Sequence, residues 1–327
     1  MNFKTKQQLG SLEVLLSSNL IVHLPYHENG GSWQPFHWDR TTSPAFTPLN
    51  LAEAEGWMKE TDPEYALLDW LAVEESGFAS PNVSQYWRGH NDAKILLTDR
   101  QRQQRQNTYS ELISYFQKAF CKVEAFTLSV KPDYGKRGHT DYTWSFIIGQ
   151  QQSGAWIGLA PNVPSETGRY VLEAFHSSVH PPEIQTRTSQ DDSSALPNEL
   201  QAFLTAIPPI KIYGWYDGGY NHIHSYSLQS ACADSKEAVI ETLWRNAQFL
   251  EVVPFDCFNL KSRYYSPHEK DESDRYSRIS RFLAESVSAL TVYRFCFWDI
   301  EMLYLLGEVE KGDHIGMFTK SQFTYNP

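Results

Sequence analysis

Cysteine is scarce in this sequence, and the few cysteines stand far apart. There are four in 327 residues, and none forms a Cys-x-x-Cys pair. That spacing argues against a disulfide framework and against a cysteine-ligated zinc site. Each lies among apolar neighbours, so we expect reduced cysteines in the core. They are Cys121, Cys232, Cys257 and Cys296.

Long apolar runs are also missing. No stretch approaches the roughly 18 consecutive apolar residues that a membrane-spanning helix needs. The N-terminal residues, Met1 to Lys4, do not lead into the apolar core of a signal peptide. We therefore expect a soluble, cytoplasmic protein without membrane contacts.

Basic charge is in short supply. Lys and Arg together number 28 against 39 Asp and Glu, which gives a formal net charge of −11. An acidic surface repels nucleic-acid phosphate and suits a basic protein partner. We expect a protein partner and no direct nucleic-acid contact, although acidity for solubility alone explains the same composition.

Catalytic signatures are few, and none predicts a cofactor. No Gly-x-Ser-x-Gly occurs, and no cysteine lies in a nucleophile motif. His222 and His224 alternate along an expected strand, a spacing that suits either a metal or a polar outer face. His37 and Asp39 offer a base and a carboxylate with the same ambiguity. We assign no catalytic and no metal-binding residue, but an enzyme whose groups come from distant positions stays open.

A frame of three glycines, in contrast, occurs twice. Gly149, Gly154 and Gly158 lie within and after an apolar run, and Gly307, Gly312 and Gly316 repeat the same intervals. The differences 307−149, 312−154 and 316−158 are all 158. An apolar run, a four-residue loop ending in Gly and a second apolar run predict a strand–turn–strand hairpin. Its recurrence predicts a duplicated domain.

The flanks of the two frames predict the domain plan. Helical periodicity and an aromatic strand precede each frame, and the chain length favours about two domains. We predict an α+β fold of two tandem domains, each an antiparallel sheet packed with helices. Their predicted bounds are 1–175, with an insertion at about 64–107, and 198–327, with a solvated linker at 176–197.

Two local patterns have both a functional and a structural interpretation. Arg100, Arg102 and Arg105 could bind an acidic partner, but we favour the solvated start of a helix beginning near Asn107. In the insertion, Trp87 beside Arg88 is the best candidate for an interface residue. Other aromatic and apolar residues of the insertion, from Tyr65 to Leu71, fit a buried helix face.

The second half resembles the nuclease A inhibitor family. The resemblance runs from Phe249–Phe258 through the acidic segment 271–274 and the strand beginning at Thr291 to the glycine frame at 307–316. The first half resembles the family more weakly, as a second, diverged copy. The resemblance implies a small acidic α/β protein that blocks a sugar-nonspecific, Mg²⁺-dependent endonuclease with acidic and C-terminal groups.

The resemblance also implies the site residues. Counting from Gly316 places Thr324 at the position of the family's terminal Thr, although three residues follow it here. We predict Thr324, Asp271, Glu272, Asp274 and Trp87 as partner-binding residues. We expect an acidic, non-enzymatic protein-binding module, with nuclease inhibition as its specific form. The alternatives are a hydrolase or metal-dependent enzyme with a site between the two domains, and an inactive scaffold.

Overall fold

The structure is a computed structural model of the whole chain. It describes residues 3–18, 20–21, 31–78, 97–131, 142–163, 175, 196–216, 219–258, 269–298, 300–310 and 312–322. These ranges contain seven helices and twelve strands, and every pair of neighbouring strands is antiparallel. The predicted α+β class is confirmed. None of the helices in these ranges is long and apolar enough to cross a membrane.

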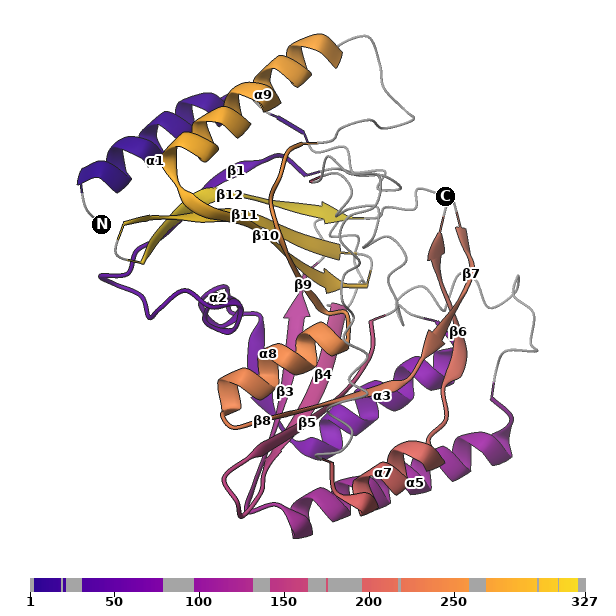
Figure 1. Cartoon of the computed structure of the whole chain (residues 1–327). Helices are drawn as coiled ribbons and strands as arrows, with labels where there is room; N and C mark the ends of the chain where they lie inside the picture. Colours follow the sequence, from indigo (N-terminus) through magenta and orange to yellow (C-terminus); the bar gives the residue numbers. More distant parts are fainter. Residues whose placement is uncertain are drawn as a thin grey trace.

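Two five-stranded sheets form the body of the protein (Figure 1). Sheet 1 has the order β1-β12-β11-β10-β9, and sheet 2 has the order β2-β3-β4-β5-β8. The strands of sheet 1 are β1 (Gln34–Trp38), β9 (Leu250–Pro254), β10 (Ser288–Phe297), β11 (Ile300–Glu310) and β12 (Asp313–Gln322). Those of sheet 2 are β2 (Met58–Thr61), β3 (Lys122–Val130), β4 (Tyr142–Gln150), β5 (Trp156–Pro161) and β8 (Leu228–Ala233). A separate hairpin pairs β6 (Ile210–Tyr216) with β7 (Gly219–Tyr226).

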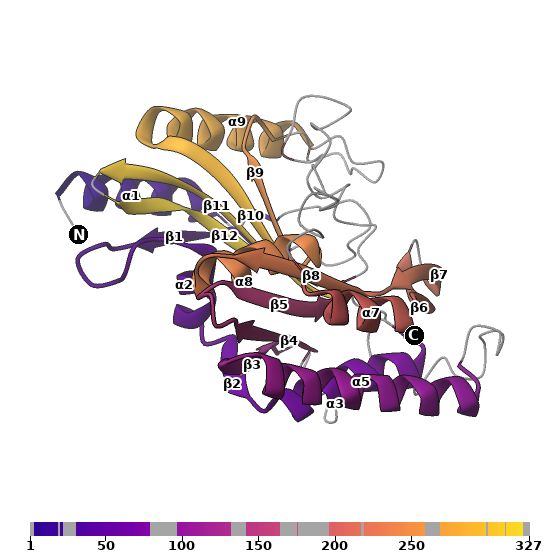
Figure 2. The same cartoon turned by 60° about the horizontal axis from the view of Figure 1, so that its bottom comes forward.

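Helices form three layers around these sheets, as Figures 1 and 2 show. The outer face of sheet 1 carries α1 (Phe3–Leu16) and α9 (Glu269–Ser286). The outer face of sheet 2 carries α3 (Pro63–Ser76), α5 (Asp99–Ala119) and α7 (Asn198–Ala206). Between the two sheets lie α2 (Pro48–Ala54) and α8 (Lys236–Asn246). Each sheet therefore has both faces covered, which explains its nearly continuous apolar strands.

One aromatic core joins the inner faces of the two sheets. Trp144 of β4 stacks on Phe249 beside β9, with ring centroids 4.5 Å apart and planes 1° from parallel. Trp244 of α8 contacts Phe146 of sheet 2 and Phe295 of sheet 1. Buried aromatic side chains contribute large apolar areas and restrict their neighbours geometrically. The core therefore holds the sheets together as one packed body.

The glycine frames form the predicted hairpins, one in each sheet. Gly149 lies in β4 and Gly158 in β5, where Ile148 pairs with Gly158. The second frame behaves identically, because Leu306 of β11 pairs with Gly316 of β12. The middle glycines, Gly154 and Gly312, have φ of 94° and 86°, a conformation that side-chain-bearing residues rarely adopt. The hairpin prediction is confirmed in both copies.

The sheets combine strands from both sides of the predicted linker. β1 precedes the linker but pairs with β12, and β8 follows it but pairs with β5. The strands thus do not separate at 176–197, of which only residues 196 and 197 are described. The boundaries 1–175 and 198–327 stay predictions, and the central part of the insertion, 79–96, lies outside the described residues.

Capping residues determine where two of the helices begin. Helix α2 starts at Pro48, because the Thr47 side chain caps it and Pro48 occupies its first turn. The helix expected near Asn107 begins at Asp99. Thr98 and Gln101 form a capping box there, a spacing that the sequence shows but that the prediction overlooked.

Candidate partner-binding surface

Helix α9 carries the predicted acidic residues, and its packing determines which face they occupy. Tyr276, Ile279 and Leu283 are buried at helical spacing against the outer face of sheet 1. Val292, Leu303, Leu305 and Met317 from the strands belong to the same apolar cluster. The opposite face of α9 therefore points to solvent along its whole described length.

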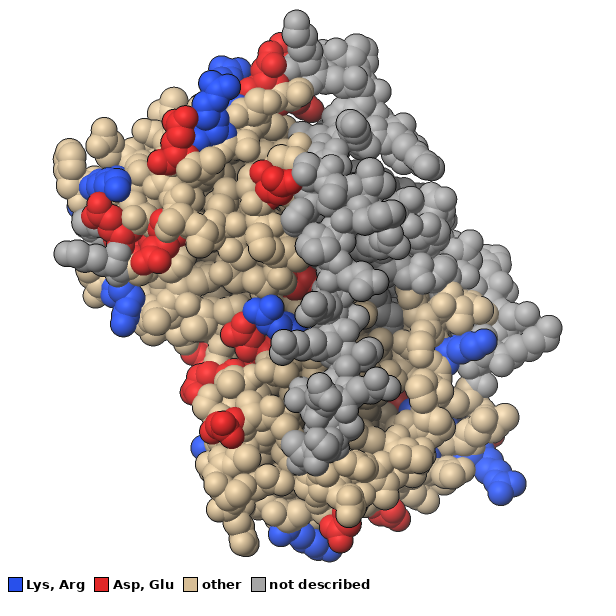
Figure 3. Space-filling model, viewed as in Figure 1, with Lys and Arg blue, Asp and Glu red and all other residues tan. Residues whose placement is uncertain are grey.

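Two of the predicted acidic residues lie on this outer face, at the start of the helix. Asp271 and Asp274 are exposed, whereas Glu272, four positions before Tyr276 and so on its side of the helix, is half-buried. Figure 3 shows red side chains at the upper end of the molecule, where α9 begins beside the undescribed residues. Carboxylates in the first turns of a helix are stabilised by its dipole. Three of the five predicted residues thus lie in the first turns of α9, two of them exposed, and we call this segment the acidic entry of α9.

Segments from the first half of the chain fix α9 in place. The Tyr276 hydroxyl donates a hydrogen bond of 3.0 Å to the carbonyl of Ile21 and accepts one of 3.2 Å from Trp33 Nε1. The Arg275 guanidinium donates to the carbonyl of Ser18. Helix α1 packs alongside. The orientation of the acidic entry therefore depends on residues 3–33 as well as on its own half.

β12 stops at the same end of sheet 1 as the acidic entry of α9. α9 ends at Ser286 and β10 starts at Ser288, so β10 begins near the far end of α9. β12 runs in the same direction as β10, because both are antiparallel to β11. It therefore ends, at Gln322, on the side where α9 begins. Thr324 lies two residues beyond, outside the described residues, and Trp87 is also outside them.

A buried charged cluster lies in sheet 1 near these strand ends. Arg294 of β10 donates to a carboxylate oxygen of Glu251 on β9 over 2.7 Å and also pairs with Glu301 on β11. The side chains of Arg294 and Glu301 are 0% exposed and that of Glu251 is 12% exposed. Glu301 is the cross-strand partner of Ser321, one residue before the end of β12. The cluster therefore links three neighbouring strands, β9, β10 and β11, close to the end of β12.

For both Glu251 and Arg294, burial and the neighbouring charges shift the pKa in opposite directions. Burial raises the pKa of Glu251 above its usual range, although the positive charge of Arg294 acts against this. For Arg294, burial alone would lower the pKa, but Glu301 and Glu251 outweigh it and raise the pKa well above its ordinary value. The guanidinium stays charged, and the cluster carries two acids against one base. The acidic partners of Arg294 lie 43 and 7 positions away on other strands, so a local sequence pattern does not reveal them.

Sheet 2 contains a second buried ion pair, which corrects the interpretation of Arg105. This side chain is not solvated: its Nε and one terminal nitrogen donate to the two carboxylate oxygens of Glu74, both over 2.7 Å. The Tyr109 hydroxyl donates to the same carboxylate over 2.7 Å, and Arg105 also donates to the Pro208 carbonyl over 2.8 Å. The arrangement is bidentate and joins α3, α5 and the segment before β6. Arg100 is exposed, as the helix-start interpretation requires.

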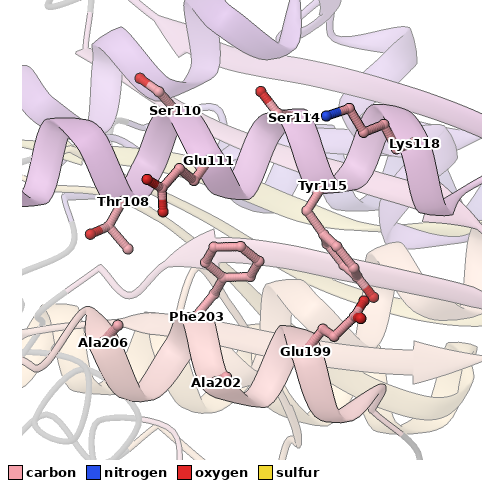
Figure 4. A pocket seen from close by; sticks show the side chains of 10 residues that line it. All are labelled: Thr108, Ser110, Glu111, Ser114, Tyr115, Lys118, Glu199, Ala202, Phe203 and Ala206. Atoms are coloured by element: carbon pink, nitrogen blue, oxygen red, sulfur yellow. The ribbon is translucent and has the colours of Figure 1, made fainter.

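A groove between α5 and α7 is a further surface feature, and the sequence did not predict it (Figure 4). Its volume is about 850 Å³. Tyr115 and Phe203 meet across it with ring centroids 5.6 Å apart, and Glu111 and Glu199 extend into it from the two helices. Burial, aided by the charge of Glu199, raises the pKa of Tyr115. The groove lies on the outer side of sheet 2, whereas α9 covers sheet 1.

The residues considered for an enzyme lie on different sheets. His37 is exposed on β1 of sheet 1, and the Asp39 carboxylate accepts hydrogen bonds from Thr41. His224 is buried on β7, which belongs to the separate hairpin. The side chain of His222 lies outside the described ones. Within the described ranges, no three His, Cys, Asp or Glu residues come together as a metal ion would require.

The cysteines are all free, but they do not share one environment. Cys296 is buried, Cys232 and Cys257 are partly buried, and Cys121 is exposed. The expectation of reduced cysteines is confirmed, and the expectation that all lie in the core is wrong. Cys121 follows the end of α5 and donates to the carbonyl of Gln150, where the hairpin edge leaves it accessible.

Tyr65 and Leu68, expected on a buried face, are likewise exposed on α3, whereas Leu67, Trp70 and Leu71 are buried.

Comparison with known proteins gives one match. A family model described as nuclease A inhibitor-like protein matches residues 209–324, which extend from the start of the β6–β7 hairpin to just beyond β12. No curated protein and no solved structure matches the chain. The family match includes α9 and the glycine frame at 307–316 and lies wholly in the second half. This chain is thus similar, over residues 209–324, to nuclease A inhibitor-like proteins.

Proposed function

We propose that the chain is an acidic, non-enzymatic protein-binding module of the cytoplasm that inhibits a sugar-nonspecific endonuclease. The observation that carries this proposal is the location of the acidic entry within the family match at residues 209–324. Asp271 and Asp274 are exposed there at the start of a helix that is fixed to sheet 1. Acidic groups on a rigid element suit a partner whose active site is basic or holds a metal ion.

In this proposal the acidic entry makes first contact and the chain end completes the interface. Asp271, Glu272 and Asp274 steer the nuclease by long-range attraction, which raises the association rate. β12 ends at Gln322, and Thr324, two positions further along the sequence, is proposed to approach the nuclease active site. Trp87 is proposed as an additional contact from the first half.

The test is a titration of a sugar-nonspecific, Mg²⁺-dependent endonuclease with the purified full chain. We expect DNA cleavage to slow at near-equimolar ratio. Undiminished cleavage at a large molar excess would contradict inhibition. A binding measurement made in parallel distinguishes a complex that leaves the nuclease active from the absence of any complex.

Charge variants identify the surface. The triple variant Asp271→Asn, Glu272→Gln, Asp274→Asn should weaken inhibition about tenfold or more, mainly through slower association at low salt. Its matched control removes three exposed carboxylates elsewhere, by Glu13→Gln, Glu60→Gln and Glu285→Gln. The control has the same net charge as the first variant, so equal losses in both would mean that only total charge matters.

A further inference from the structure

The two sheets are built alike, but each takes one strand from the other half of the chain. In sheet 2, the second-half strand β8 lies beside β5 at the edge of the first-half strands β2 to β5. In sheet 1, the first-half strand β1 lies beside β12 at the edge of the second-half strands β9 to β12. β1 and β8 therefore occupy the same position in opposite sheets.

The register of the two added strands is identical relative to the glycine frames. Gly158 of β5 pairs with Ala231 of β8, and Gly316 of β12 pairs with Phe36 of β1. The neighbouring pairs also correspond: Ala160 with Gln229 and Phe318 with Gln34, Ile157 with Cys232 and Ile315 with His37. A register shift by one residue would turn every side chain to the other face. Phe36 and Ala231, opposite the last glycine of each frame, both pack against the core between the sheets, as equivalent strands in exchanged places require.

The helices follow the same exchange. α1 from the first half packs beside α9 of the second half, and α7 from the second half packs beside α5 of the first. The helix after each exchanged strand, α2 or α8, lies between the sheets, and the next strand, β2 or β9, forms the opposite edge of its own half's sheet. Each strand of one sheet, and each helix packed on it except α3, then has a counterpart in the other sheet.

We propose that the halves 1–175 and 198–327 are duplicated domains that have exchanged their first helix and strand, so that the partner-binding unit is composite. That unit consists of residues 3–38 and 250–322, and its link to binding rests on the proposed function. The exchanged segment contributes to the surface itself. Gly31 lies so close to the end of β12 that a Cβ there would be 1.9 Å from the Lys320 carbonyl oxygen and 2.4 Å from Thr319 Oγ1. Residues of the first half thus position the last residues before Thr324.

Cysteine pairs in the full chain test the exchange directly. The variant His37→Cys, Ile315→Cys offers the cysteine at position 315 two partners. An exchanged fold forms a disulfide between positions 37 and 315, whereas a self-contained second half would place native Cys232 opposite position 315. The variant Gln34→Cys, Phe318→Cys provides a second pair, and Gln229→Cys, Phe318→Cys is its self-contained counterpart.

The two exchanged pairs are three residues apart along β1, so one is hydrogen-bonded and the other is a closer, non-hydrogen-bonded pair. At least one therefore lies within disulfide reach. Peptide mapping after mild oxidation should find the 37–315 or the 34–318 bond. A 232–315 or 229–318 bond would overturn the exchange, and so would the absence of all four bonds.

A separate variant tests whether the exchanged segment contributes to partner binding. Gly31→Ala should displace the end of β12 and weaken nuclease inhibition at least threefold, with the unfolding midpoint measured in parallel to exclude global loss of structure. Gly10→Ala on α1 is the matched control, because a Cβ there has nothing within 4 Å. Inhibition equal to that of the unaltered chain would remove residues 31–33 from the surface. If the unaltered chain inhibits no nuclease, the proposed function fails, whereas the disulfide result still decides the exchange.

Discussion

Replacing Arg294 with methionine should destabilise the protein strongly, and more at high pH than at low pH. The side chains of Arg294 and Glu301 are fully buried, and Glu251 is 12% exposed. Without the guanidinium, Glu251 and Glu301 lose the buried cation that they share. Removing one partner of a buried ion pair costs about 3–5 kcal/mol. A domain's total stability is only about 5–15 kcal/mol.

The pH dependence has a definite sign. Burial already holds the pKa of Glu251 above its ordinary value, and loss of Arg294 removes the charge that opposes this shift. An acid whose pKa is raised in the folded state binds more protons there than in the unfolded state. Burying this acid therefore does not lower the free energy of unfolding at a pH below the acid's pKa in the unfolded state. The loss of stability grows as the pH rises through its pKa in the folded state. Arg294→Met should lose the full amount at pH 8 and clearly less at pH 5.

Urea unfolding at the two pH values measures both quantities. The triple variant Arg294→Met, Glu251→Gln, Glu301→Gln should recover much of the loss at pH 8, because it also removes the two buried carboxylate charges that Arg294 balances. Arg245→Met is the exposed control: its 2.7 Å ion pair with Glu241 joins residues one turn apart on α8. An exposed pair of this kind contributes about 0.3–0.5 kcal/mol. A pH-independent loss for Arg294→Met, or one no larger than for Arg245→Met, would refute the reasoning.

Three further predictions concern stability. Phe249→Ala removes the ring stacked on Trp144 between the sheets, so it should lower the free energy of unfolding by about 3–5 kcal/mol. Fluorescence and circular dichroism should still report one common unfolding transition, and separate transitions would contradict a shared core. Glu74→Gln leaves Arg105 without its carboxylate and should lower the free energy of unfolding, measured in urea, by about 3 kcal/mol. A change under about 0.5 kcal/mol would mean that water replaces the pair. Gly154→Ala should cost about 1 kcal/mol through its φ of 94° alone, because no atom lies within 4 Å of the added Cβ; Gly154→Asn should cost less.

The sequence predicts those parts of the fold that depend on local patterns. Each glycine frame places a turn between apolar runs, and this suffices for a hairpin whatever surrounds it. The helical spacing of Tyr276, Ile279 and Leu283 likewise predicts the buried face of α9. Continued back by four residues, this face passes through Glu272 and leaves Asp271 and Asp274 outside it, so the exposure of these two carboxylates was predictable without the structure.

Long-range pairing was not predictable from one sequence. β1 and β8 fit the same position in the same register, so each half's sequence is compatible with a self-contained sheet or an exchanged one. The burial of Arg105 escaped prediction for a related reason: its partner Glu74 lies 31 positions away, on another helix. In both cases the missing information is which distant segments meet, and local periodicity does not contain it.

Hydrogen–deuterium exchange of the full chain, with and without a sugar-nonspecific endonuclease, tests the central claim most directly. The acidic entry of α9, the end of β12 and the exchanged segment before β1 should gain protection together in the complex. The corresponding peptides cover residues 269–275, 316–322 and 31–36. Protection confined to the groove between α5 and α7, or to the second half without residues 31–36, would contradict a composite binding surface.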